Sequence, residues 1–114
     1  MAQYIVWVTT GDDEHAGTDS NVFIRLAGTQ GVSETLHLPA QDVFAFEAGS
    51  VDKFVLDVPD LGDLRECCIG HDNSDGGWYV KTVQIQHEAT GSQWGFVFEQ
   101  WLDEAGELST CVVV

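Results

Sequence analysis

One short loop carries the residue types that bind a hard metal ion. The run Ala16-Gly17-Thr18-Asp19-Ser20-Asn21 separates two stretches of β-branched and aromatic residues, 4–8 and 22–26. A Gly-Thr-Asp turn brings backbone carbonyls and a carboxylate around one point, and oxygen ligands of this kind bind Ca²⁺. The loop is therefore a candidate Ca²⁺ site, although a positive-φ glycine capped by Asp19 or Asn21 would give the same sequence.

Two later loops concentrate acidic residues in the same way. Glu47 lies in the loop 39–50, and Asp72 and Asp75 lie in the loop 70–77. Carboxylates that converge without compensating charge repel one another, and a bound divalent ion relieves that repulsion. A modest ligand count on loops predicts weak affinity, with a dissociation constant on the order of 10⁻⁵–10⁻³ M. Glu47 also fits a solvated turn, and Asp72 fits an Asx turn.

No catalytic arrangement is evident in the sequence. The paired carboxylates of a glycosidase need a substrate cleft, and Ser-His-Asp chemistry lacks its Gly-x-Ser-x-Gly elbow here. The histidines, at positions 15, 37, 71 and 87, include no His-x-x-x-His pair for zinc. We therefore expect no catalysis and no small-molecule substrate, and we interpret His71 as a strand-end residue that makes hydrogen bonds.

The cysteines are Cys67, Cys68 and Cys111. An odd count without spaced pairs argues against a disulfide framework and against a cysteine-based zinc site. Adjacent residues of a strand point to opposite faces, so we expect Cys67 in the core and Cys68 at the surface.

The charge balance limits the choice of partners. The chain has 114 residues, with 19 Asp and Glu against 4 Lys and Arg, for a net charge of −15. Nucleic acid is excluded as a partner, because phosphate binding depends on Lys and Arg. An anionic membrane would also repel the protein unless bound cations cancelled the charge locally. Most of these carboxylates are interpreted as a solubility surface, and a few as ligands of a cation.

The chain shows no membrane-spanning or secretory segment. No run approaches the roughly 20 apolar residues of a membrane span, and Met1-Ala2-Gln3 begins neither a basic region nor a long apolar stretch. We therefore expect a soluble protein, whose contact with a membrane would be peripheral.

The hydrophobic pattern predicts an all-β fold, an antiparallel eight-stranded β-sandwich in one domain that spans residues 1–114. Residues 3–102 are its core, and 103–114 either add a closing strand or begin a linker. Helical turns have room only at 40–47 and 99–105. The predicted strands are 3–9, 21–28, 33–38, 51–58, 64–70, 78–87, 93–99 and a β-prone end from 109. The side chains expected to be buried are Trp7, Val22, Ile24, Phe54, Ile69, Trp78 and Phe98, and Trp94 and Trp101 are assigned to the core as well.

An ordered set of motifs carries a family resemblance. After the Gly17-Thr18-Asp19 turn come Phe46-Glu47-Ala48-Gly49, Leu61-Gly62-Asp63-Leu64 and His71-Asp72-Asn73, the last leading to Trp78. In this order and at these intervals, from about Gln3 to Leu102, the chain resembles the PLAT (lipoxygenase-homology) domain of lipoxygenases, lipases, clostridial alpha-toxin and polycystin-type proteins.

The resemblance implies a Ca²⁺ site and a set of ligands. Gly17 and Asp19 match the primary ligands of the family, with backbone oxygens from His15 and Thr18. Glu47 matches the family's glutamate, whereas Ala48 replaces a basic residue. The remaining positions differ: Phe44 and Ala45 stand where many relatives have Asn and Asp, with Asp42 nearby, and Gly77 replaces an Asp, with Asp75 and then Asp72 as the nearest substitutes.

The family resemblance also implies a function. Relatives dock on membranes through aromatic residues of the Ca²⁺ loops; here Glu14 occupies that place in the first loop, so Phe44 is the expected membrane contact and Phe46 a core residue. The expected function is a non-catalytic, Ca²⁺-dependent module that targets a membrane or lipid surface. The alternative is a protein–protein interaction module that docks a partner or a companion catalytic domain. A carbohydrate-binding module shares the architecture, but the motifs favour the PLAT family.

Overall fold

The computed structural model describes residues 1–39 and 45–114, and these residues form an antiparallel β-sandwich without helices. The fold class predicted from the sequence is confirmed. The described residues contain nine strands rather than eight, because the two-residue strand Gly31–Val32 pairs with the strand Val22–Gly28. The strands are β1 (Ala2–Thr10), β2 (Val22–Gly28), β3 (Gly31–Val32), β4 (Leu36–Leu38), β5 (Val51–Val58), β6 (Leu64–His71), β7 (Trp78–His87), β8 (Gln93–Leu102) and β9 (Ser109–Val113).

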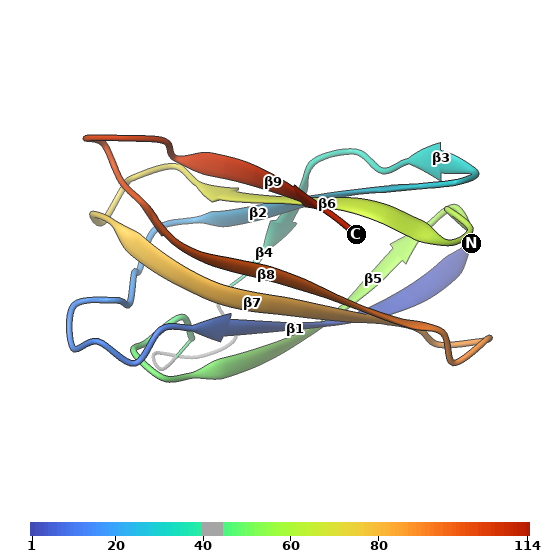
Figure 1. Cartoon of the computed structure of the whole chain (residues 1–114), viewed down its shortest axis with the longest axis horizontal. Coiled ribbons are helices and arrows are strands. Elements are labelled where there is room, and N and C mark those ends of the chain that lie inside the picture. Colours follow the sequence, from blue (N-terminus) through green and yellow to red (C-terminus); the bar gives the residue numbers. More distant parts are fainter. Residues whose placement is uncertain (40–44) are drawn as a thin grey trace.

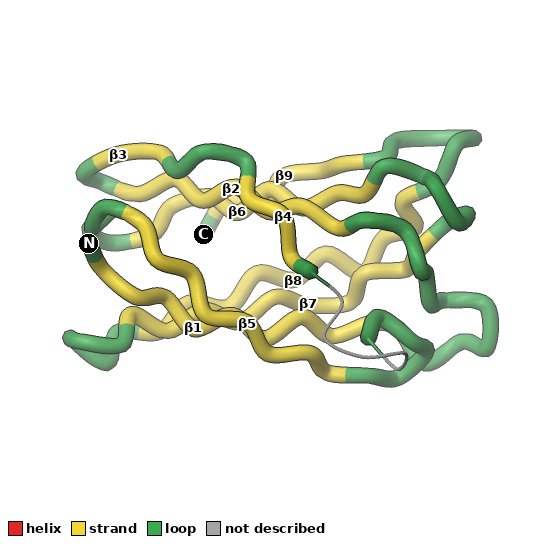
Figure 2. The backbone as a smooth tube through the Cα atoms, turned by 180° about the vertical axis from the view of Figure 1, so that it is seen from behind, coloured by secondary structure: helices red, strands yellow, loops and turns green. Residues whose placement is uncertain are grey.

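The strands form two layers that face each other (Figures 1 and 2). One sheet has the order β5-β1-β7-β8, and the other has the order β3-β2-β6-β9, with β4 also paired to β2. All strand pairs are antiparallel. The inner faces of the two layers enclose the hydrophobic core.

Alternating side chains explain why these segments are strands. In β5, Phe54, Leu56 and Val58 point into the core, while Val51 and Val55 remain exposed on the other face. The largest buried side chain is Trp78, whose indole N–H donates to the hydroxyl of Thr10 over 3.0 Å. A buried indole N–H needs such a partner, because an unpaired one is costly to desolvate. Other core side chains are Tyr4, Val6, Ile24, Leu26, Leu38, Phe46, Ile69, Ile85, Phe96 and Phe98.

Two of the tryptophans differ from the prediction. Trp7 is half-buried and Trp101 is 42% exposed, whereas Trp94 is half-buried and packs against the core. Trp7 lies between the inward residues Val6 and Val8, so its side chain is on the outer face of β1. Strand membership alone therefore predicted burial incorrectly, whereas Trp78 has an inward position and is buried.

The segment 99–105 is not a helical turn. β8 continues to Leu102, and its pairing with β7 shifts register between Val80 and Thr82. Glu99, on the opposite strand, has a left-handed φ of 45°. An extra residue of this kind is a β-bulge, which lets the strand continue past a local irregularity.

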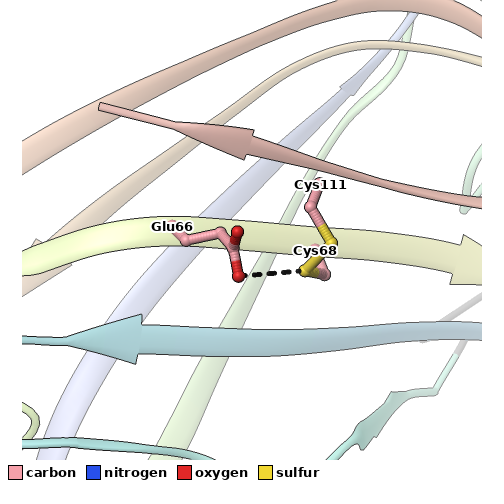
Figure 3. A group of neighbouring side chains, drawn as sticks. All are labelled: Glu66, Cys68 and Cys111. Atoms are coloured by element: carbon pink, nitrogen blue, oxygen red, sulfur yellow. Dashed lines mark hydrogen bonds between the residues drawn. A yellow bond between two sulfur atoms is a disulfide. The ribbon is translucent and has the colours of Figure 1, made fainter.

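The C-terminal segment forms a strand and contains a disulfide. β9 pairs with β6, and in this register Cys68 lies opposite Cys111. These two cysteines form a disulfide, which corrects the interpretation drawn from the cysteine count (Figure 3). The count failed because the pairing of β6 with β9, and not sequence spacing, brings the two sulfurs together. Cys67 is buried, as predicted.

Within the part of the chain that the structure describes, no helix has the length and apolar character needed to cross a membrane.

Candidate calcium-binding loops

Three loops meet at one end of the sandwich. β1 ends at Thr10 and β2 begins at Val22, β5 begins at Val51, and β6 and β7 are joined by the segment after His71. These connections lie together at the left of Figure 1, at the opposite end from the N-terminus. We call the described residues of this region, 11–21, 45–50 and 72–77, the loop end.

The first and third loops are joined by hydrogen bonds. The backbone N–H of Asp19 donates to Oδ2 of Asp75 over 3.1 Å. In the other direction, the backbone N–H of Asp75 donates to the hydroxyl of Ser20 over 2.8 Å. The hydroxyl of Thr18 donates to the carbonyl of Gly76 over 3.3 Å. Two of the predicted ligands, Asp19 and Asp75, are therefore brought together.

The first and second loops touch through Gly17. A Cβ atom on Gly17 would lie 2.9 Å from the carbonyl oxygen of Phe46 and 3.0 Å from Cα of Glu47. The next residue, Thr18, donates its backbone N–H to the same carbonyl over 2.9 Å. Gly17 is thus required for a close approach of two backbones and not for a positive φ. This contact places Glu47 beside Gly17.

The second loop is anchored by Asp52, which belongs to a motif of the family resemblance, Val51-Asp52-Lys53-Phe54, but was given no role from the sequence. Oδ2 of Asp52 accepts from the backbone N–H of Phe46 over 2.9 Å and from the hydroxyl of Ser50 over 3.0 Å. Phe46 adopts a left-handed φ of 57° and is buried, with its ring against Phe54 and Trp78. The prediction that Phe46 belongs to the core is confirmed. Phe44 and Asp42 lie outside the described residues.

The carboxylate of Asp72 joins the first loop to the third by hydrogen bonds. Oδ1 accepts from the backbone N–H of Asn21 and from the backbone and hydroxyl of Ser74, and Oδ2 accepts from the side-chain amide of Asn21 over 2.7 Å. These donors, first of all the Asn21 amide and the Ser74 hydroxyl, hold the pKa of Asp72 well below its usual range. The arrangement fits the Asx-turn interpretation.

The two histidines of this region differ in their surroundings. His15 is exposed, and its Nε2 lies 3.3 Å from the carboxylate of Glu14. His71 is buried at the end of β6, and its Nδ1 accepts from the backbone N–H of Asn73 over 3.1 Å. The other nitrogen, Nε2, therefore carries the proton and donates to the carbonyl of Leu102 over 2.7 Å. This confirms His71 as a strand-end residue that makes hydrogen bonds.

The loop end offers oxygen donors, which suit Ca²⁺ better than softer metals. Carboxylates come from Asp19, Glu47 and Asp75, and carbonyls from the turn around Gly17. Among the described residues, the one group of three His, Cys, Asp or Glu ligand atoms within 4.8 Å of one another is Glu66, Cys68 and Cys111. The acidic side chains of the loop end therefore do not form a closed cluster by themselves, and a cation there would also need backbone oxygens.

Sequence reasoning identified the acidic residues but missed those that connect the loops. Ser20 and Asn21 join the first loop to the third, and Asp52 holds the second. Ser, Asn and Asp in such segments bond to nearby backbone groups. This preference indicates that Ser20, Asn21 and Asp52 make hydrogen bonds to loop residues, but the sequence does not show which loop each of them contacts.

A comparison against protein families agrees with the fold. The family model for the PLAT/LH2 domain matches residues 4–110. This chain therefore belongs to the PLAT/LH2 domain family.

Similar proteins are much longer than this chain. It is 38% identical over 105 residues to mouse (Mus musculus) lipoxygenase homology domain-containing protein 1, covering 90% of this chain and 5% of that protein. It is 36% identical over 113 residues to mouse polycystin-1-like protein 3, covering 96% of this chain and 5% of the relative. The crystal structure of a coral 8R-lipoxygenase, described as activated by calcium through a C2-like domain, superposes with a TM-score of 0.85 at 30% identity, covering 97% of this chain and 16% of the enzyme.

Proposed function

We propose that this chain is a non-catalytic module that uses Ca²⁺ at the loop end to bind a lipid or membrane surface. The observation that supports it most is the hydrogen bond from Asp19 to the Asp75 carboxylate, which places two acidic residues from different loops side by side. The similarity to a lipoxygenase that calcium activates through a C2-like domain supports the choice of ion.

In this proposal each residue of the loop end has a definite task. Asp19, Glu47 and Asp75 provide carboxylates, and His15, Gly17 and Thr18 provide backbone oxygens. Asp72 is nominated as a ligand from the sequence; in the geometry described above it holds the first loop against the third, and a ligand role would compete with those hydrogen bonds. Bound Ca²⁺ supplies positive charge where the protein is acidic.

Charge explains why the surface would be bound only with the ion present. A domain with a net charge of −15 is repelled by anionic headgroups. Neutralisation at the loop end lowers that repulsion locally, and a zwitterionic surface adds none. We propose Phe44 as the side chain that enters the lipid, because it lies in the second loop next to the anchored Phe46 and Glu47.

A second candidate is a module that binds a protein, and the outer face of the β5-β1-β7-β8 sheet favours it. Val51, Val55 and Val97 on this face are each more than half exposed, and Trp7 is half-buried between Lys53 and Gln84. The outward residues of the central strand β1, which are Gln3, Ile5, Trp7 and Thr9, carry no charge, whereas β5 contributes Lys53 and Asp57 to the same face. A partly aliphatic face with few charges resembles the centre of a protein interface.

Co-sedimentation with phosphatidylcholine vesicles, with Ca²⁺ or with a chelator, distinguishes the two candidates. The proposal predicts that the native domain pellets only with Ca²⁺, and that Phe44→Ala and Asp19→Asn both abolish pelleting. Val55→Ser, on the sheet face, serves as the control and should pellet like the native domain. Absence of pelleting with Ca²⁺ present would contradict lipid binding and favour a protein partner at the sheet face.

A further inference from the structure

A disulfide lies on the outer surface of the molecule, at the edge of the β3-β2-β6-β9 sheet. Cys68 is half-buried and Cys111 is exposed, and Figure 3 shows the bond between their sulfurs. Because Cys67 and Ile69 point into the core, Cys68 points away from it. The two cysteines line a surface groove of about 330 Å³, together with Phe23, Arg25 and Ser109. A small thiol therefore has access to the sulfur of Cys111.

Two opposite charges flank the inner sulfur. Nη2 of Arg25 lies 3.4 Å from Sγ of Cys68, and Oε1 of Glu66 lies 3.6 Å from the same atom. Arg25 and Glu66 are themselves 3.7 Å apart. A guanidinium stabilises a thiolate, and a carboxylate destabilises it. After reduction, Arg25 therefore favours the thiolate form of Cys68, and Glu66 disfavours it.

The third cysteine, Cys67, does not take part in thiol–disulfide exchange. Cys67 points into the core, and burial raises the pKa of its thiol far above the usual range. A buried thiol that stays protonated is a poor nucleophile. Exchange with the disulfide must therefore come from a thiol outside the protein.

Apart from the disulfide, few contacts hold the strand β9 in place. β9 pairs with β6, and none of its residues is buried. Its inward side chains, Thr110 and Val112, are half-buried. By contrast, β2, on the other side of β6, contributes Val22, Ile24 and Leu26, all buried, to the core. Since apolar burial is the main source of stability and β9 contributes only the partly buried Val112 to it, β9 depends mainly on its backbone hydrogen bonds and on the disulfide.

We propose that Cys68–Cys111 is a thiol–disulfide exchange site, and that its reduction by a dithiol releases β9 from the edge of the sheet. The thiolate of the dithiol attacks Sγ of Cys111, the Cys68–Cys111 bond breaks, and Cys68 leaves as a thiolate beside Arg25. The second thiol of the reagent then attacks the mixed disulfide and expels Cys111. The dithiol is oxidised to a disulfide by two electrons, and both cysteines end as thiols after Cys68 and Cys111 take up protons.

Release of β9 changes a defined part of the surface. The edge of β6 from Glu66 to Gly70, which β9 covers, becomes open to pairing. The backbone N–H of His71 also loses its partner, the carbonyl of Leu108, if the segment before β9 moves with the strand. The rest of the sandwich keeps its core.

Native-state reduction with dithiothreitol, followed by hydrogen exchange, tests both parts of the proposal. We expect complete reduction without unfolding, and at least tenfold faster exchange at residues 109–113 and their partners on β6, with β1 and β7 unchanged. Arg25→Gln should slow reduction about threefold or more, and Glu66→Gln should accelerate it to a similar extent, since the leaving thiolate controls the rate. Cys67→Ala, the control, should behave like the native chain.

Two results would overturn the proposal. Unchanged exchange at residues 109–113 after full reduction would show that the disulfide does not hold β9. Equal reduction rates in the native chain, Arg25→Gln and Glu66→Gln would show that the surrounding charges do not tune this disulfide. The double variant Cys68→Ser/Cys111→Ser should reproduce the exchange pattern of the reduced protein, which separates loss of the bond from effects of the reagent.

Discussion

The backbone N–H of Asp19 donates to the carboxylate of Asp75 over 3.1 Å, across a sequence separation of 56 residues. This bond holds the carboxylate of Asp75 next to Asp19, which carries the second carboxylate. Ser20 and Thr18 add bonds between the same two loops. The loops are therefore held together before any cation binds, which lowers the ordering cost that binding would otherwise carry.

Removing one of these two carboxylates should abolish the stabilisation by Ca²⁺. A ligand that binds only the folded state, at about a hundredfold excess over its dissociation constant, adds about 2.7 kcal/mol to the free energy of unfolding. For a domain of this size the melting temperature rises by about 10 °C. We expect Asp19→Asn and Asp75→Asn to lose most of this rise in a calorimetric melt. Asp57→Asn, an exposed change on β5, is the control and should keep it.

Gly17 should not tolerate a larger residue, because its neighbours are backbone atoms. The Cβ of Gly17→Ala would lie 2.9 Å from the Phe46 carbonyl oxygen, so one loop must shift. We expect a loss of about 1–3 kcal/mol in urea unfolding, in the range of overpacked sites. Gly95→Ala provides the comparison, since its Cβ would have no heavy atom within 4 Å. Equal stabilities of the two variants would contradict the close contact between the loops.

Loss of the disulfide should destabilise the domain measurably. Cys68 and Cys111 are separated by 43 residues, and closing a loop of this length restricts the unfolded chain by about 4 kcal/mol in the chain-entropy treatment. We expect Cys68→Ser/Cys111→Ser to lower the free energy of unfolding by about 2–4 kcal/mol in guanidinium titrations. A variant as stable as the native chain would mean that the disulfide contributes nothing to folding.

Stability should depend on pH through Asp60, at the end of the molecule opposite the loop end. The backbone N–H of Gly62, followed by His87, lowers the pKa of Asp60. The folded state therefore favours the carboxylate more than the unfolded state does, with its pKa near 3.9. The resulting stability is complete above about pH 4 and is lost as the pH falls through the lower, folded pKa. Melting curves of the native chain and Asp60→Asn should differ at pH 7 and converge toward pH 2. A difference that stayed constant with pH would rule out this role.

Local sequence patterns predicted the strands well. Residues 51–58 and 78–87 form strands with the predicted bounds, because inward and outward side chains alternate along both, apart from the register shift between Val80 and Thr82. The bulge at Glu99 was not predictable, because a left-handed φ at a glutamate has no signal in the sequence. The outward positions of Trp7 and Trp101 depend on which face of each sheet meets the other layer.

The contacts between the loops were harder to predict from the sequence than the loops themselves. Asp19 and Glu47 were chosen by motif, and Asp75 as the nearest substitute for an Asp that the family has at Gly77. The hydrogen bond of Asp19 to Asp75 and the packing of Gly17 on Glu47 depend on strand order. The disulfide is similar, since Cys68 meets Cys111 only after β9 has paired with β6. Long-range pairing of this kind is set by the whole sandwich and not by any local window.

A calcium titration followed by amide NMR tests the central claim most directly. The proposal predicts saturable shifts at millimolar Ca²⁺ that concentrate in residues 15–19, 47–49 and 72–77, with Mg²⁺ much less effective. The same titration of Asp19→Asn should show no saturation in this range. Absence of saturable shifts in the native chain, or shifts spread evenly over exposed carboxylates such as Asp57 and Glu88, would contradict a calcium site at the loop end.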